Sequence, residues 1–190
     1  MIRRPATVRA QRKKGTAIAV RKIVVRTLNP RSQRGWLACG NLVFRCALGR
    51  GGILTAKREG DGATPRGRFR LESARYRADK LRRPHTALPL STTRTDDGWC
   101  DAATDRNYNR AVTHPYPASA EKLWRTDGLY DVFVVLDYNR LPRRRGRGSA
   151  IFLHVAGEGL APTEGCVALA RRDLLKLLPL IDRHTRLVVV

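Results

Sequence analysis

Acidic residues are missing from the first third of this sequence. Residues 1–58 contain fifteen Lys or Arg and no Asp or Glu, and the whole chain of 190 residues has 38 basic against 16 acidic side chains. The formal net charge is therefore +22. A charge of this size attracts polyanions in general but identifies none of them. Nucleic acids and the anionic polymers of a cell envelope both remain open as partners.

Cysteine and histidine are scarce, with four of each in the chain. The cysteines form no CxxC pair and no cluster with the histidines, so the sequence indicates neither a zinc site nor a dense disulfide framework. We expect no metal and no cofactor. The thiols are expected to be reduced or buried.

Long apolar runs are absent as well. The one apolar stretch of the basic N-terminus, residues 17–20, is too short for the core of a signal peptide and far too short to span a bilayer. The sequence as given therefore shows no export signal and no membrane span. Residues 1–20 are polar, basic and aperiodic, and we expect them to form a flexible arm before a single domain over residues 21–190.

What the sequence does contain is a series of short β-type runs separated by turn residues. They predict a mainly β fold with few helices, whose first half is an antiparallel meander. These runs are residues 22–28, 36–40, 42–48, 53–58, 67–77, 130–138, 150–156 and 186–190.

Two segments have helical character. Residues 118–125 have Ser119 as a helix cap, and residues 171–181 repeat leucines on one helix face until Pro179 limits the helix. Between residues 78 and 130 the pattern is irregular. A connection of this length inside a compact domain usually carries binding groups.

One stretch combines the residue types that cysteine catalysis needs. In FLHVAGEGLAPTEGCVALARRD, residues 152–173, His154 ends a strand-like run and Cys166 follows Gly165 in a turn. A cysteine nucleophile requires a base for its proton and N–H donors for the oxyanion. We expect His154 to be the base and the amides of Gly165 and Cys166 to be the donors. The alternative, which spacing alone favours, is a structural histidine and an inert buried thiol.

Two further motifs accompany this pair. REGDGATPRGRF at residues 58–69 carries Thr64, Pro65, Gly67 and Phe69, and TRLVVV ends the chain after the helix-like run. Together with His154 and the TEGC element that ends in Cys166, they resemble the catalytic domain of the YkuD-type L,D-transpeptidase family. The resemblance covers roughly residues 22–190, and three motifs in one order are far more specific than any one of them.

The resemblance implies a mainly β sandwich with a few short α-helices, and chemistry on peptidoglycan stem peptides. Cys166 would attack the carbonyl of an L,D peptide bond and release D-alanine, with His154 accepting the thiol proton. Transfer of the acyl group to an amine forms a cross-link, whereas transfer to water makes the enzyme an L,D-carboxypeptidase. The family implies a place in the periplasm or cell envelope. The missing export signal leaves a cytoplasmic location open.

Two positions depart from the family pattern. Glu164 lies beside the cysteine, where an anion disfavours the thiolate, so we expect its side chain to point away or to contact an incoming amine. Ala168 stands where family members carry a basic residue that orients the donor peptide. We expect Arg171, Arg172 or a basic residue of the stretch 78–130 to replace it.

Further substrate contacts are predicted from polar side chains. Near the cysteine they are Thr163, Glu164 and Arg171, and in the irregular stretch they are Asn107, Tyr108 and Asn109. For the last three, an ordinary polar turn is the equal alternative.

The rival function of another class is nucleic-acid binding by the acid-free first third. The sequence has the charge for it but no helix-turn-helix, zinc-finger or RNP-like motif. We therefore expect peptidoglycan peptides and envelope polyanions, rather than nucleic acid, as partners.

Overall fold

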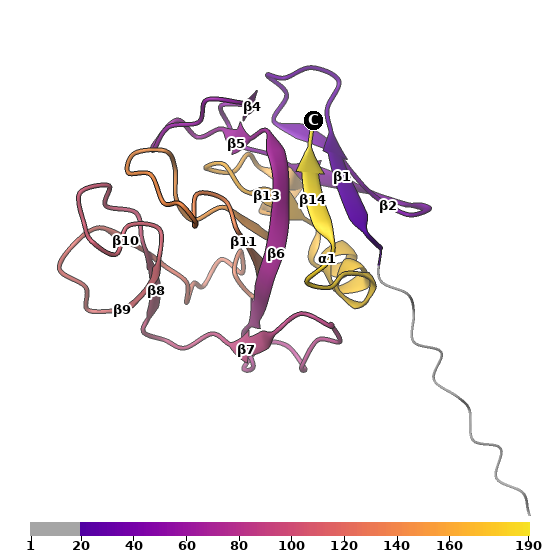
Figure 1. Cartoon of the computed structure of the whole chain (residues 1–190). Helices are drawn as coiled ribbons and strands as arrows, with labels where there is room; N and C mark the ends of the chain where they lie inside the picture. The colour runs from indigo at the N-terminus through magenta and orange to yellow at the C-terminus, as the bar shows by residue number, and fades with distance from the viewer. Residues whose placement is uncertain (1–19) are drawn as a thin grey trace, which may run out of the picture.

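The computed structural model describes residues 20–190, and most of their regular structure is β (Figure 1). The strands are β1 (Lys22–Arg26), β2 (Arg34–Cys39), β3 (Leu42–Ala47), β4 (Ile53–Leu54), β5 (Thr64–Pro65), β6 (Gly67–Tyr76), β7 (Leu90–Thr92), β8 (Asp97–Cys100), β9 (Ala111–Thr113), β10 (Ala120–Lys122), β11 (Val132–Leu136), β12 (Phe152–Val155), β13 (Val167–Leu169) and β14 (Arg186–Val189). The described residues contain one α-helix, α1 (Arg171–Leu177), and two 3₁₀ turns, η1 (Glu158–Leu160) and η2 (Leu178–Leu180).

Nine strands form one continuous sheet in the order β11-β12-β13-β3-β2-β1-β14-β6-β7. A further pairing of β11 with β6 closes this sheet into a ring, and Figure 1 shows β6, β14 and β1 side by side along it. The mainly β fold that the sequence predicts is confirmed. The sequence resemblance implied a sandwich of two layers. In the structure, these layers are the opposite sides of one closed sheet.

The predicted antiparallel meander holds only for β1, β2 and β3, which pair consecutively. It is wrong beyond them, because β4 is two residues long and pairs in parallel with β5. The long strand β6 then pairs with β14 and β11 from the far end of the chain. Pairings between distant segments depend on tertiary packing, which a local pattern does not contain.

The main hydrophobic core lies inside the ring. It receives side chains from each long strand, and Leu174 and Leu177 of α1 pack into it. Both faces of strand β11 are covered. Val132 and Val134 point into this core, whereas Phe133 points to a second cluster on the other face. This accounts for the continuous apolar run of that strand. The terminal helix is confirmed over Arg171–Leu177, after which Pro179 falls in η2.

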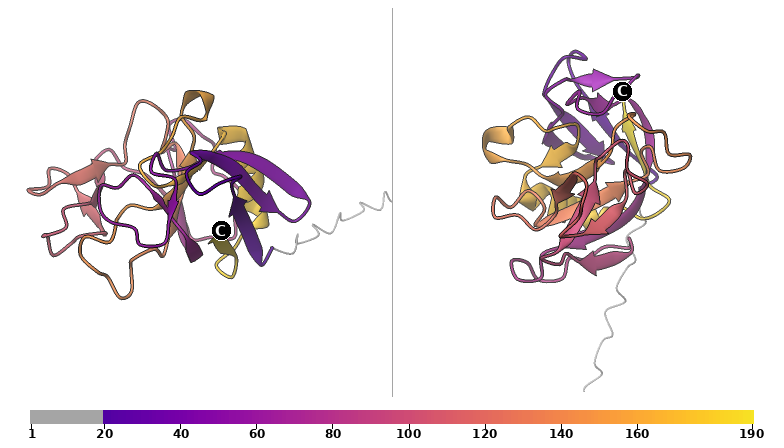
Figure 2. Two further views of the ribbon diagram at one scale, coloured as in Figure 1. Left: turned by 90° about the horizontal axis from the view of Figure 1, so that it is seen from above. Right: turned by 90° about the vertical axis from the view of Figure 1, so that its left-hand side faces the viewer.

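A small sheet of β10, β8 and β9 stands apart from the ring, on the side away from β1 and β2 (Figure 2). The second hydrophobic cluster joins this region to the outer face of β11 and β12, through buried side chains that include Trp99, Leu123, Tyr130, Phe133 and Phe152. Cys166 belongs to the same cluster. The irregular stretch therefore folds over one face of the main sheet.

The predicted helix over residues 118–125 is wrong. This segment contains β10, in which Glu121 is opposite Trp99 of β8, and Leu123 just after it is fully buried in the second cluster. Helix propensity is a weak preference that tertiary pairing overrides, and this segment is too short to form a stable helix by itself.

The expected basic arm lies outside the described residues, apart from Val20. The backbone N–H of Val20 donates to the Leu180 carbonyl at 2.9 Å. None of the helices in residues 20–190 has the length and apolar character needed to cross a membrane.

Replacing Leu153 by alanine tests the main core. Leu153 is fully buried on β12, so Leu153→Ala should lower the free energy of unfolding by about 2–5 kcal/mol, through lost apolar burial and the cavity left behind. Chemical denaturation measures this change. Leu141→Ala is the control, because Leu141 is 94% exposed and its loss should change stability by less than about 0.5 kcal/mol. Equal effects of the two substitutions would contradict the assigned core.

Candidate active site

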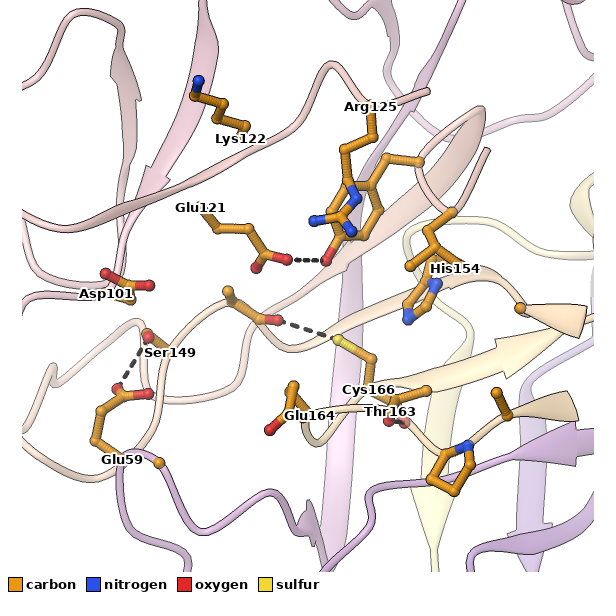
Figure 3. Close-up of a pocket in the computed structure, with 17 residues that line it drawn as sticks. Glu59, Asp101, Glu121, Lys122, Arg125, Ser149, His154, Thr163, Glu164 and Cys166 are labelled. Atoms are coloured by element: carbon orange, nitrogen blue, oxygen red, sulfur yellow. Dashed lines mark hydrogen bonds between the residues drawn. The ribbon is translucent and has the colours of Figure 1, made fainter. Parts of the chain in front are cut away.

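The parallel pairing of β12 with β13 brings His154 and Cys166 together. In its register Leu153 is opposite Val167 and His154 is opposite Ala168. Cys166 directly precedes β13, and its sulfur accepts the N–H of Phe152 at 3.3 Å. Side chains alternate along strands, so Cys166 and His154 project from the same outer face while Leu153 faces the core. Figure 3 shows both side chains in one pocket.

The Cys166 thiol is held by backbone groups of the neighbouring strand. Its Sγ donates to the Ala150 carbonyl at 3.2 Å, and Ala150 has a left-handed backbone with φ 52°. Burial, and after it the nearby Glu121 carboxylate, raises the pKa of the Cys166 thiol to about 12. Cys166 is therefore a neutral thiol at rest.

His154 is oriented by its own strand. The Nδ1 atom lies 2.8 Å from the Val155 carbonyl, which can only accept, so Nδ1 carries the hydrogen and Nε2 keeps its lone pair. Burial lowers the pKa of His154 to about 4, and the ring of Tyr130 packs edge-on against it at 5.3 Å. A neutral imidazole in this tautomer can accept a proton through Nε2.

The turn before Cys166 is fixed by two threonines. Thr163 Oγ1 donates to the Cys166 carbonyl at 2.7 Å and accepts the Gly165 N–H at 3.2 Å. Thr64 Oγ1 also donates to the Cys166 carbonyl, at 3.4 Å. Gly165 has φ 130°, and a Cβ there would lie 2.7 Å from the Ala63 carbonyl oxygen. The two sequence motifs therefore pack against each other, which explains why they occur together.

The pocket over these residues has a volume of about 650 Å³. Its polar lining contains more acidic than basic side chains, the reverse of the chain as a whole: Glu59, Asp101, Glu121 and Glu164 against Lys122 and Arg125. The Tyr130 hydroxyl donates to Glu121 Oε1 at 2.6 Å, and burial raises the pKa of Glu121. The pocket thus presents carboxylates and cations around one thiol.

Comparison with known proteins agrees with these motifs. The family model of the YkuD L,D-transpeptidase catalytic domain matches residues 22–190. The chain belongs to this family. No curated protein and no solved structure matches it. Within residues 20–190, no group of three or more His, Cys, Asp or Glu side chains is arranged to hold a metal ion.

Thr163 and Glu164, two of the predicted substrate contacts, line the pocket of this YkuD domain. The Glu164 carboxylate pairs with Arg50 at 2.8 Å, and both side chains are largely exposed. It points away from the thiol in Figure 3. Its side chain is thus directed to the rim, and it raises the pKa of Cys166 less than burial and Glu121 do.

The other predicted substrate contacts do not line this pocket. Tyr108 is fully buried and donates to Glu59. Asn109 accepts the N–H groups of Trp99 and Ala150, and Asn107 donates to Tyr116. The hydrogen bonds of these three side chains go to other side chains and to the backbone, as in the polar-turn alternative.

Arg171 also lies elsewhere. It begins α1, where its guanidinium is 3.5 Å from Asp131, and it lines a different groove.

One of the three alternatives for Ala168 was a basic residue of the irregular stretch, and that stretch supplies two basic residues of the pocket lining. Lys122 and Arg125 line the pocket. Sequence reasoning missed Glu121 and Tyr130, because it placed Glu121 in a helix and treated Tyr130 as the start of a strand. Their hydrogen bond joins two segments that come together only when β10 pairs with β8.

Substituting Gly165 tests the turn. Gly165→Ala adds a Cβ against the Ala63 carbonyl in a region of φ that alanine avoids, so it should destabilise the protein by about 3 kcal/mol or more. Gly146→Ala is the matched control. Gly146 also has a positive φ, of 72°, but nothing within 4 Å of its Cβ position, so about 1 kcal/mol is expected. Thermal denaturation compares them, and similar losses would contradict the close contact.

Stability should depend on pH through His154. Its pKa is about 4 in the folded protein against 6.5 for the free side chain, so the unfolded chain binds more protons between these values, and stability falls as the pH drops through this window. Between pH 6.5 and 4.5, the free energy of unfolding should fall by about 2–3 kcal/mol less in His154→Gln than in the wild-type protein. Denaturation at several pH values measures it, with the exposed His85 as the control in His85→Gln. An unchanged pH dependence in His154→Gln would refute the buried neutral histidine.

Proposed function

We propose that this protein is a cysteine-dependent L,D-transpeptidase acting on peptidoglycan stem peptides. The observation that carries the proposal is the position of Cys166 and His154 on one face of adjacent parallel strands, in the pocket of a domain from this family. The thiol, the unprotonated Nε2 and the backbone amides of the TEGC turn are the groups that acyl transfer needs.

In the acylation step, His154 Nε2 accepts the thiol proton as the sulfur attacks the carbonyl carbon of the L,D peptide bond. The negative charge that forms on the carbonyl oxygen faces the amides of Gly165 and Cys166, and the Gly165 N–H is shared with Thr163. Collapse breaks the C–N bond, and His154 returns the proton to the leaving amine of D-alanine. The product is a thioester at Cys166.

The resting protonation states favour proton transfer during the attack. With a thiol pKa of about 12 and an imidazole pKa of about 4, a thiolate–imidazolium pair is costly before substrate binds. The proton therefore moves as the new bond forms and the negative charge passes to the oxyanion.

The acceptor in the second step is proposed to be an amine. Attack of an amine on the thioester forms the cross-link and restores the thiol. The carboxylates of Glu121, Asp101 and Glu59 around the pocket suit an incoming ammonium group. Water in the same place would yield a shortened stem peptide, which is the activity of an L,D-carboxypeptidase.

Lys122 and Arg125 are proposed to bind the carboxylates of the donor stem in place of the family's basic residue at position 168. Arg125 stands over Tyr130, next to His154 (Figure 3). We propose a location at the cell envelope, which the proposed substrate and the family support, and where a net charge of +22 favours contact with anionic envelope polymers.

Replacing the nucleophile tests the function. Cys166→Ala should abolish turnover of a purified disaccharide tetrapeptide, because no thioester can form, while leaving the thermal unfolding temperature nearly unchanged. Mass spectrometry of the products also identifies the acceptor. Cross-linked dimers support the transpeptidase, and tripeptides alone indicate the carboxypeptidase. Cys39→Ala is the control, because Cys39 is buried on β2 away from the pocket, and it should keep activity.

A thiol-reactive β-lactam of the carbapenem class provides an independent readout. It should add its mass to the wild-type protein at Cys166 and not to Cys166→Ala. If the wild-type protein leaves muropeptides untouched and the β-lactam fails to acylate Cys166, the proposed enzyme activity is wrong, and the nucleic-acid-binding alternative becomes the better hypothesis.

A further inference from the structure

Lys57 is a buried cation in the loop between β4 and β5. Its side chain is 3% exposed. The ammonium donates to Asp61 Oδ1 at 2.6 Å and lies 3.4 Å from the Arg58 carbonyl. Asp61 is itself fixed by the N–H groups of Arg58 and Ala63. Removing an ion pair from water is costly, so the burial of Lys57 with Asp61 needs a physical explanation.

Two glycines make room for this lysine. A Cβ at Gly148 would lie 2.7 Å from Lys57 Cε, and a Cβ at Gly165 would lie 3.2 Å from Lys57 Nζ. Gly165 immediately precedes the nucleophile, and Gly148 lies two residues before Ala150, whose carbonyl accepts the thiol hydrogen bond. The ammonium therefore lies against the backbone on which Cys166 is held.

The charged groups around Cys166 come from several elements. Glu121 of β10 and Glu164 in the turn are carboxylates that raise the pKa of the thiol, after the larger effect of burial, whereas Lys57 lowers it. His154 on β12 is neutral at physiological pH, and Tyr130 faces the pocket with its hydroxyl bonded to Glu121. Lys57 itself faces Asp61 and the ring of Tyr138, which adjoins Gly148.

We propose that Lys57 is a positioning residue for Cys166: its buried ammonium, held by Asp61, fixes the Gly165 turn and stabilises the negative charge that develops on the sulfur. The inference rests on the proposed role of Cys166 as nucleophile and adds the cation that this role requires. Asp61 orients the lysine. As its counter-charge, Asp61 also weakens the stabilisation of negative charge on the Cys166 sulfur by Lys57.

The rate at which iodoacetamide alkylates Cys166 tests this assignment. Mass spectrometry of the Cys166 peptide follows the rate across pH and separates it from the other three cysteines. Lys57→Met should slow alkylation about three- to tenfold at each pH below the thiol pKa, which is an upward shift of the profile by up to about one pH unit. Lys22→Met removes the same charge from an exposed position on β1 and should change nothing.

Asp61→Asn provides the opposite change. An asparagine oxygen still accepts from Lys57 but no longer offsets its charge, so alkylation of Cys166 should become faster and the profile should shift to lower pH. If the ion pair of Lys57 and Asp61 is merely structural, both variants should shift the pH profile of Cys166 alkylation in the same direction. Shifts of the same sign, or an unchanged profile in Lys57→Met, would overturn the proposal.

Folding and function are separated in the same experiment. If Lys57→Met does not fold, as judged by circular dichroism, the direction of the Asp61→Asn shift decides: a shift to lower pH supports the proposal, and any other result refutes it. Alkylation needs no peptidoglycan. A wild-type protein that ignores muropeptides but shows both shifts would disprove the proposed substrate and leave the assignment of Lys57 intact.

Discussion

The register between the short parallel strands β12 and β13 determines whether His154 and Cys166 lie on the same face of the sheet. The pairing of β12 with β13 sets His154 opposite Ala168, and a slip of one residue would turn either His154 or Cys166 towards the core. Parallel neighbours also require a crossover connection. Here it is residues 156–166, and Gly157, Ala161, Pro162 and Thr163 of this connection line the pocket. The connection that the parallel pairing requires therefore also lines the pocket.

Burial against the second cluster explains why the site is neutral at rest. Cys166 packs with Phe152 and Tyr130, and removal from water disfavours both the thiolate and the imidazolium. Reactivity then depends on the few fixed charges that reach the sulfur. Glu121 opposes the thiolate, so a compensating cation matters more here than in a solvent-exposed site, and Lys57 is placed to provide it.

The sequence predicts those parts of the structure that local patterns encode. Apolar runs identify the longer ring strands and the terminal helix but not the three-residue strand β13, and the TEGC and TPRG motifs identify the neighbourhood of Cys166 because close backbone contacts there require glycine and threonine. The segment 118–125 was mispredicted because its strand state depends on β8, more than twenty residues earlier. Lys57 and Glu121 were missed for a related reason: each becomes a neighbour of Cys166 only through long-range packing, and an isolated Lys or Glu is ordinarily a surface residue.

Under the proposed function, another element of the fold supplies the charge that the family pattern has at position 168. Ala168 is fully buried and is opposite Ala47 of β3, so a long basic side chain there would have to displace packed atoms. The segment after β10 brings Arg125 into the same pocket from the other side, where Asp127 and the ring of Tyr130 hold its guanidinium. A cation near His154 is therefore retained without a side chain at position 168. Because Arg125 approaches from the irregular stretch, the carboxylate site proposed for the donor stem depends on the fold of that stretch rather than on β13.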